Sequence, residues 1–98
     1  MSKNHTVVVI IESIIGKEDE LKQVLMKLME LSRAENSCLE YRLHQDQNNS
    51  NQFVMYENWE STELHQEQFN KSYVMTLGKE MEPLLAKPCQ VIFANELF

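Results

Sequence analysis

The chain has 98 residues, of which 43% are hydrophobic, and it carries a formal net charge of −6 at pH 7. This length supports one domain with a single, thin hydrophobic core. The acidic balance, with only nine Lys and Arg residues scattered along the chain, disfavours a binding surface for nucleic acid or for an anionic membrane.

The longest uninterrupted apolar run, residues 7–11, is too short for a membrane span or for the core of a signal peptide. No zinc, P-loop or dinucleotide-binding spacing is present. Cys38 and Cys89 fit no metal pattern, so we expect two reduced thiols, with a disulfide as the alternative. These features predict a cytoplasmic protein without a bound metal and without a membrane or nucleic-acid partner.

The first half of the chain alternates between strand and helix patterns. Residues 6–13 are dense in β-branched side chains and predict a strand. After a turn at Gly16, acidic residues and then apolar residues at helical spacing predict a helix over residues 17–34. Residues 38–46 alternate again and predict a second strand.

The second half begins with a polar turn at residues 46–51, which predicts an antiparallel hairpin between strands 38–46 and 53–59. Ser61 is a suitable N-cap for a helix over residues 61–69. A second helical piece is predicted over residues 73–85, and a last strand over residues 90–98.

This order of elements, β-α-β-β-α-β, predicts an α+β fold of the ferredoxin-like type that uses residues 1–98 as a single domain. Its four-stranded antiparallel sheet has the helices on one face. The helix-free face keeps apolar residues, including Ile92 and Phe98, and such a surface marks an interface. We therefore expect a two-fold homodimer with the sheets packed face to face or curled into one barrel.

The strand at residues 53–59 contains the most informative pattern. Side chains two apart share one face of a sheet, so Phe53, Met55, Glu57 and Trp59 form one row. A row that ends in a carboxylate and an indole suits the wall of a partly apolar pocket. Buried there, Glu57 needs a partner or takes a shifted pKa. The alternative is an ordinary strand whose Glu57 pairs with a neighbouring side chain.

Several short motifs along the chain, in this order, resemble the antibiotic biosynthesis monooxygenase family of small dimeric α+β barrel proteins. The resemblance covers nearly all of the chain. The motifs are Ser32-Arg33-Ala34-Glu35, Cys38-Leu39-Glu40-Tyr41, Leu43-His44-Gln45-Asp46, Asn51-Gln52-Phe53, Phe53-Val54-Met55-Tyr56-Glu57-Asn58-Trp59, Ser61 and Pro83-Leu84-Leu85.

The resemblance implies a cofactor-independent monooxygenase that oxidises a small aromatic quinol or phenol with molecular oxygen and uses no metal or flavin. Such a protein holds a flat substrate, removes a proton and stabilises the developing oxyanion. Trp59 matches the family's pocket as a stacking wall and N–H donor. Glu57 matches a position that the family keeps, where we expect it to order the strand or pocket rather than to act as the base.

Departures from the family's pattern narrow the prediction. Gln68 stands where many relatives have histidine, and His65, one turn earlier, could replace it unless it is a solvated surface histidine. Met55 stands where relatives that oxidise polyketide phenols have Asn, which disfavours a polycyclic phenol. No histidine follows His65, so the axial ligand of the haem-degrading branch is missing and haem is not expected.

The candidate site therefore has two groups. The catalytic candidates are Trp59, His65 and Glu57; the substrate-binding candidates are Phe53, Met55, Tyr41, His44, Gln68, Phe69 and Tyr73. For several of these an alternative stays open. His44 could instead join a polar row with Arg42, Tyr41 could be a core residue with its hydroxyl tethered, and Phe69 and Tyr73 could be ordinary core.

Two other functions also stay open. An isomerase of a small phosphorylated or hydroxylated carbonyl compound would place a phosphate near Arg42. A non-catalytic small-molecule binding or stress-related module would need no base at all.

Overall fold

A computed structural model of the chain describes residues 4–97, and its elements follow the predicted order. They are β1 (His5–Glu12), α1 (Glu18–Arg33), β2 (Cys38–Gln45), β3 (Gln52–Trp59), α2 (Thr62–Gln68), α3 (Ser72–Met81), the 3-10 turn η1 (Glu82–Leu84) and β4 (Gln90–Ala94). The last strand is shorter than the predicted residues 90–98, because β4 ends at Ala94. Phe98 lies outside the described residues.

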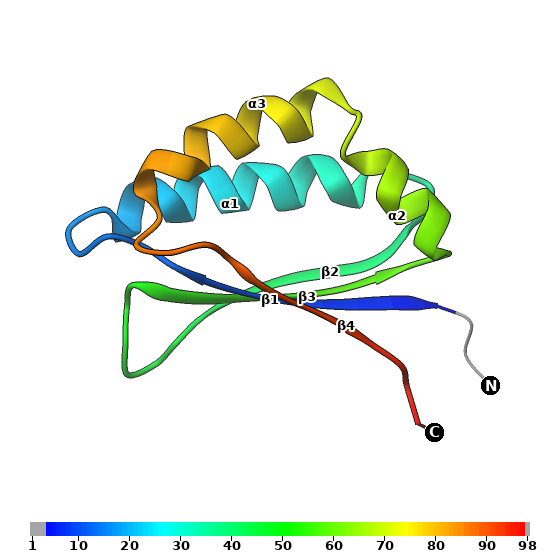
Figure 1. The fold of residues 1–98 in the computed structure, drawn as a ribbon, viewed down its shortest axis with the longest axis horizontal. Helices are drawn as coiled ribbons and strands as arrows, with labels where there is room; N and C mark the ends of the chain where they lie inside the picture. Colours follow the sequence, from blue (N-terminus) through cyan, green and yellow to red (C-terminus); the bar gives the residue numbers. More distant parts are fainter. Residues whose placement is uncertain (1–3, 98) are drawn as a thin grey trace.

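The strands form one antiparallel sheet in the order β2-β3-β1-β4. All three helices lie on one face of this sheet, with α1 and α3 side by side over it and α2 at one end (Figure 1). The other face carries no helix within the described residues. This arrangement confirms the predicted ferredoxin-like α+β fold.

Local sequence explains where α1 begins. Gly16 has a φ of 94°, a left-handed conformation that glycine adopts without steric cost. Its backbone N–H donates to the side chain of Glu18. The first turn then carries acidic residues, which interact favourably with the positive end of the helix dipole. From there α1 presents Leu21 and Leu25 to the sheet, where both are buried.

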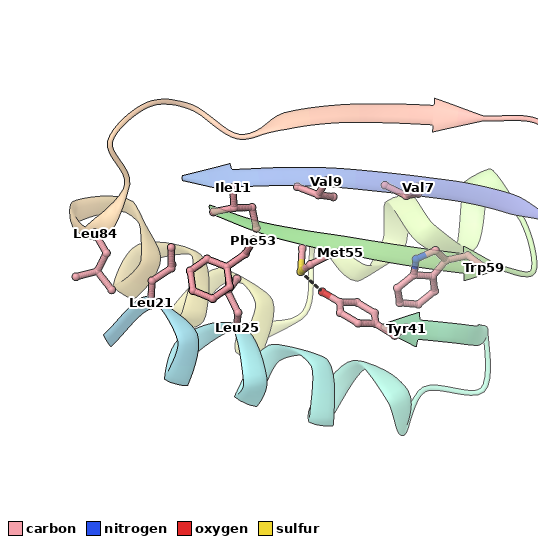
Figure 2. Packing of buried hydrophobic residues seen from close by; sticks show 10 residues of the cluster. All are labelled: Val7, Val9, Ile11, Leu21, Leu25, Tyr41, Phe53, Met55, Trp59 and Leu84. Atoms are coloured by element: carbon pink, nitrogen blue, oxygen red, sulfur yellow. Dashed lines mark hydrogen bonds between the residues drawn. The ribbon is translucent and has the colours of Figure 1, made fainter. Parts of the chain in front are cut away.

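Figure 2 shows how the buried core is divided along the sheet. At one end, Leu21 and Leu25 of α1 pack with Phe53 of β3, and Ile11 and Leu84 lie at the same end. Further along β3, Met55 and Trp59 lie beside Tyr41 of β2, whose hydroxyl donates to Met55 Sδ at 3.2 Å (Figure 2). We call the first group the aliphatic end of the core, and the group of Met55, Trp59 and Tyr41 borders the cavity described below.

The helix-free face presents an apolar strip across β3, β1 and β4. The register pairs Val8 with Tyr56 and with Ile92, and Ile10 with Val54, so these five side chains share one face. All five are at least partly exposed to solvent. We call this group of side chains the open-face patch.

In the described part of the chain, none of the helices combines the length and the apolar character that crossing a bilayer requires. Cys38 and Cys89 are free thiols.

Candidate functional site

A cavity of about 630 Å³ lies between the helices and the sheet. This volume is in the range of small-molecule binding sites. Its walls are mostly apolar and come from every layer of the fold. The apolar lining includes Val9 of β1, Leu28 of α1, Met55 of β3, Met75 and Met81 of α3, and Val91 of β4.

The cavity opens to solvent between α2, α3 and the edge strand β4. Phe69, Met75, Val91 and Phe93 all line it, and each exposes more than half of its surface, from 51% to 58%. The charged side chain of Lys79 also lines the cavity and is exposed. The entrance is therefore apolar, with a charged group beside it.

Glu57 is the deepest charged group of the cavity wall. It is only 4% exposed, and its Oε1 accepts a hydrogen bond of 2.8 Å from Trp59 Nε1. Among residues 4–97, no Lys or Arg forms an ion pair with it. Burial raises the pKa of Glu57 to about 7, and the Trp59 hydrogen bond offsets part of that rise. At neutral pH this carboxyl group can therefore both accept and release a proton.

His65 lies next to this carboxylate. Its Nε2 is 3.9 Å from Glu57 Oε1, and its ring is 5.2 Å from that of Trp59. The interpretation of His65 as a solvated surface histidine is wrong, because α2 turns the side chain inward and only 6% of the residue is exposed. Burial, and then the nearby His5, lower the pKa of His65 to about 4. The imidazole is therefore neutral at pH 7.

Gln68 follows His65 by one turn of α2, is 7% exposed, and also lines the cavity. The hydroxyl of Tyr73 lies 3.1 Å from Gln68 Oε1 and 2.9 Å from Glu35 Oε2. Lys71 forms an ion pair with the same Glu35 at 2.9 Å. This network fixes the junction between α2 and α3 against the end of α1, and so it holds the wall that carries His65 and Gln68.

The structure brings most of the predicted site residues together. Those that line the cavity are Trp59, Glu57, His65, Met55, Tyr41, Gln68 and Phe69. Three predicted residues do not line it. Phe53 packs in the aliphatic end of the core. The Tyr73 hydroxyl forms hydrogen bonds in the network at the α2–α3 junction. His44 is exposed in the opposite row of β2 from Tyr41, because alternate residues of a strand face opposite sides.

Sequence reasoning missed His5, which belongs to the same cluster. Its ring lies 5.0 Å from that of His65 and 5.0 Å from that of Phe93. The ferredoxin-like strand order could have identified His5, because this order pairs the first strand with the third in antiparallel orientation. In that register His5 stands opposite Trp59.

The geometry supports proton transfer at the wall of an apolar cavity. A buried carboxylate with a pKa near neutrality is a suitable general base, and the neighbouring neutral imidazole offers a second proton-transfer group. Within residues 4–97, no group of three or more His, Cys, Asp or Glu side chains is arranged to hold a metal ion.

Comparisons with known proteins agree with this architecture. The chain is similar over its whole length to PA3566 from Pseudomonas aeruginosa, with 30% identity, a TM-score of 0.92 and 98% of that chain covered. A crystal structure of an antibiotic biosynthesis monooxygenase superposes with a TM-score of 0.90 at 19% identity, covering 95% of this chain and 98% of that one. At that identity the likeness shows the fold alone.

An uncharacterised protein of Synechocystis is 27% identical over 75 residues, or 76% of this chain. The chain spans about half the length of that curated relative, 51%. The family model described as antibiotic biosynthesis monooxygenase matches residues 4–75, which include the Glu57–Trp59 strand and His65. The chain therefore belongs to the antibiotic biosynthesis monooxygenase family.

Proposed function

We propose that the protein is a cofactor-independent monooxygenase that oxidises a small aromatic phenol or quinol with molecular oxygen. The observation that carries the proposal is the Glu57 carboxylate, which lines an apolar cavity and forms no ion pair with a Lys or Arg within the described residues. A strongly perturbed carboxyl group in a cleft is characteristic of functional sites. Family membership supports an oxygenase-like or ligand-binding role for the same cavity.

In the proposed reaction, Glu57 accepts the proton of the phenolic hydroxyl. This role replaces the expectation from the sequence that Glu57 only orders the strand or pocket, because burial raises its pKa to about 7. The resulting phenolate is electron-rich and passes electrons to oxygen inside a cavity with mostly apolar walls. Trp59 contributes a flat wall for the aromatic ring. Its N–H is already bound to Glu57 Oε1, so we assign this donor to alignment of the carboxylate and not to the substrate.

The chemistry balances without a second reductant. A phenol reacts with O₂ to give a quinone and water: the ring carbon loses a hydrogen and gains one oxygen atom. The other oxygen atom leaves as water, whose two hydrogens balance in number the two that the substrate loses, with exchange through solvent. The substrate thus supplies all the electrons, and neither NADH nor a reduced cofactor is consumed.

The structure bears differently on the two alternative functions, an isomerase and a non-catalytic binding module. Arg42, the residue expected to bind the phosphate of an isomerase substrate, is exposed and does not line the cavity. Its Nε forms an ion pair of 2.6 Å with Glu40. This placement disfavours the isomerase. A binding module without turnover would use the same cavity, and it becomes one outcome of the experiment below.

We also propose that the working form is a homodimer in which the open-face patch meets its copy in a second chain. An exposed apolar strip of this kind marks an interface, and a two-fold pairing of identical sheets would cover it. We place the protein in the cytoplasm, and the free thiols Cys38 and Cys89 support a reducing compartment.

Trp59 is the only tryptophan of the chain, so its fluorescence reports directly on ligands in the cavity. We expect small phenols and quinols to quench this fluorescence in the wild type and in Glu57→Gln alike. Oxygen consumption should fall at least about 100-fold in Glu57→Gln, because a positioned general base contributes that much or more. Quenching in both proteins without oxygen consumption in either would establish the binding module instead. Equal turnover in both would show that Glu57 is not the base.

A further inference from the structure

Two imidazoles continue outward from Glu57, and each has one nitrogen without a partner. His65 directs Nε2 toward Glu57 Oε1 at 3.9 Å, while its Nδ1 is buried without a hydrogen-bond partner within residues 4–97. His5 has its Nδ1 3.3 Å from Thr62 Oγ1, while its Nε2 is likewise buried and unpartnered in the described part of the chain. An unsatisfied buried polar atom is costly, so two in one cluster call for an explanation.

The two unpartnered nitrogens belong to neighbouring rings. The centroids of His5 and His65 are 5.0 Å apart, with the ring planes tilted by 43°. This separation is compatible with a hydrogen bond between nitrogens at the rims of the two rings. A neutral imidazole has one N–H and one lone pair, so a bond from His65 Nδ1–H to His5 Nε2 would satisfy both atoms.

We propose that Glu57, His65 and His5 form a proton relay that leads from the cavity to the protein surface beside Thr62. The inference rests on the proposed function, because the relay is needed only if Glu57 accepts a proton from a bound molecule. Thr62 is exposed at the start of α2, so the outer end of the relay meets solvent.

Each step moves one proton and breaks no other bond. Protonated Glu57 gives its proton to Nε2 of His65, and His65 releases the proton on Nδ1 to Nε2 of His5. His5 then releases its Nδ1 proton to water beside Thr62, and Glu57 is a carboxylate again. Both imidazoles now carry their proton on Nε2, and one proton that returns from solvent along the same route to complete the product water restores the starting tautomers. The distance of 3.9 Å between His65 and Glu57 is long for a hydrogen bond, and such contacts tighten when a site is occupied.

The surroundings confine the proton to this route. Aromatic rings border His65 on several sides: Trp59 and Phe69 at 5.2 Å each and Phe93 at 6.2 Å. Among the described residues, the ionisable groups that face His65 are Glu57 from β3 and His5 from β1. Burial keeps the pKa of His65 low, so the proton crosses this ring without resting on it.

The first experiment is independent of turnover. The chain has three histidines, so a protein labelled with ¹⁵N-histidine gives a simple spectrum in which exposed His44 is the internal reference. We expect a nitrogen–nitrogen coupling across the hydrogen bond between His65 Nδ1 and His5 Nε2. In His5→Phe, which keeps a ring against Phe93 but has no nitrogen, the His65 Nδ1 signal should shift to that of an unbonded nitrogen. Absence of the coupling together with an unchanged His65 signal in the variant would overturn the relay.

The second experiment separates proton transfer from packing. With a phenol that the wild type oxidises, His5→Phe should turn over at least about tenfold more slowly in dilute buffer. Added imidazole should restore the rate, because an external base can accept the proton from His65. His5→Gln, which is polar but cannot pass a proton on, should behave in the same way. A loss that imidazole leaves unchanged in both variants would show a structural role. If the wild type oxidises no phenol, the proposed function fails, while the nitrogen coupling still decides on the relay.

Discussion

The indole of Trp59 and the carboxylate of Glu57 act as one unit in the cavity wall. The N–H of Trp59 donates to Glu57 Oε1 at 2.8 Å, and both side chains are almost completely buried. This hydrogen bond lowers the pKa of a carboxyl group that burial alone would raise further. Trp59 therefore shapes the site in two ways, as a flat surface for the ligand and as the group that tunes the base.

Replacing Trp59 with Phe should remove both contributions while leaving an aromatic ring in place. We expect ligand affinity or turnover to fall at least about tenfold, and the pKa of Glu57 to rise above its present value of about 7. The rising limb of kcat/KM against pH should therefore move to higher pH. Steady-state kinetics over a pH series would measure this shift.

Phe53→Leu is the matched control, since Phe53 lies in the aliphatic end of the core and not at the cavity. It should cost stability on the order of 1 kcal/mol without changing ligand affinity. If Trp59→Phe behaves in the same way, with a large fall in melting temperature and unchanged binding, Trp59 is only a core residue.

Glu57 also predicts how stability depends on pH. Its pKa is raised from 4.5 to about 7 on folding, so between these values the folded state keeps a proton that the unfolded state has lost. Stability from this group is complete below pH 4.5 and is lost as the pH rises through 7. Glu57→Gln cannot ionise, so its stability relative to the wild type should grow by about 3 kcal/mol over this interval. Urea unfolding from pH 4.5 to 8 would measure the difference, and a constant difference would contradict the shifted pKa.

At the scale of single residues, strand alternation was enough to predict the buried row that contains Glu57 and Trp59. It was not enough to predict their mutual hydrogen bond, because two residues of the same row can also point apart along the strand. The inward orientation of His65 depends on how α2 docks on the sheet, and the contact between His5 and His65 joins residues 60 positions apart. No local pattern contains that information.

Among the elements, α2 is the short helix that carries both His65 and Gln68 to the cavity. It has seven residues, and its start is fixed by Ser61, whose Oγ accepts from the backbone N–H of Leu64 at 3.1 Å. A helix this short has little stability of its own, so its cap and its packing hold it in place.

Ser61→Ala should therefore destabilise the protein by about 0.5–2 kcal/mol, as the loss of an N-cap does. Because α2 positions His65, ligand affinity should also fall by a measurable amount. Ser72→Ala, at the exposed first residue of α3, is the control and should change neither quantity. Thermal unfolding and Trp59 quenching would be measured on both variants. An unchanged melting temperature in Ser61→Ala would show that packing alone fixes α2.

The sequence predicted which elements exist better than where they end. Strand periodicity and the turn at residues 46–51 predicted the β2–β3 hairpin closely. The predicted helix over residues 73–85 ends earlier, because α3 ends at Met81 and η1 begins at Glu82, directly before Pro83, which has no N–H to continue an α-helix. The extent of β4 is fixed by its pairing with β1, which ends with Thr6 opposite Ala94. A partner strand far away in sequence decides such a boundary.

At the scale of the whole molecule, the open-face patch predicts the oligomeric state. Tyr56 of β3 belongs to this patch, is paired with Val8 of β1, and is 37% exposed. We expect the wild type to sediment as a dimer at micromolar concentration and Tyr56→Arg to sediment as a folded monomer, because a buried unpaired charge at the seam is costly. Thr76→Arg, an exposed position on the helix side, adds the same charge and should stay dimeric. A well-folded wild-type monomer under these conditions would remove the basis for a face-to-face dimer.

For the whole molecule, the order of elements was enough to predict the ferredoxin-like sheet with one helix-free face. The cavity could be predicted only as a row of residues along β3. Its volume and its entrance depend on how far α2 and α3 stand from β4, and that spacing is set by packing between several elements at once.

The most direct test of the central claim is oxygen uptake by the purified protein with a series of small phenols and quinols. The assay should contain a metal chelator and no NADH or flavin. We predict consumption of one O₂ for each molecule of phenol converted to quinone, saturable in the phenol and dependent on Glu57. Uptake that occurs only after NADH, a flavin or a metal is added would contradict a mechanism in which the substrate provides every electron and Glu57 removes the proton.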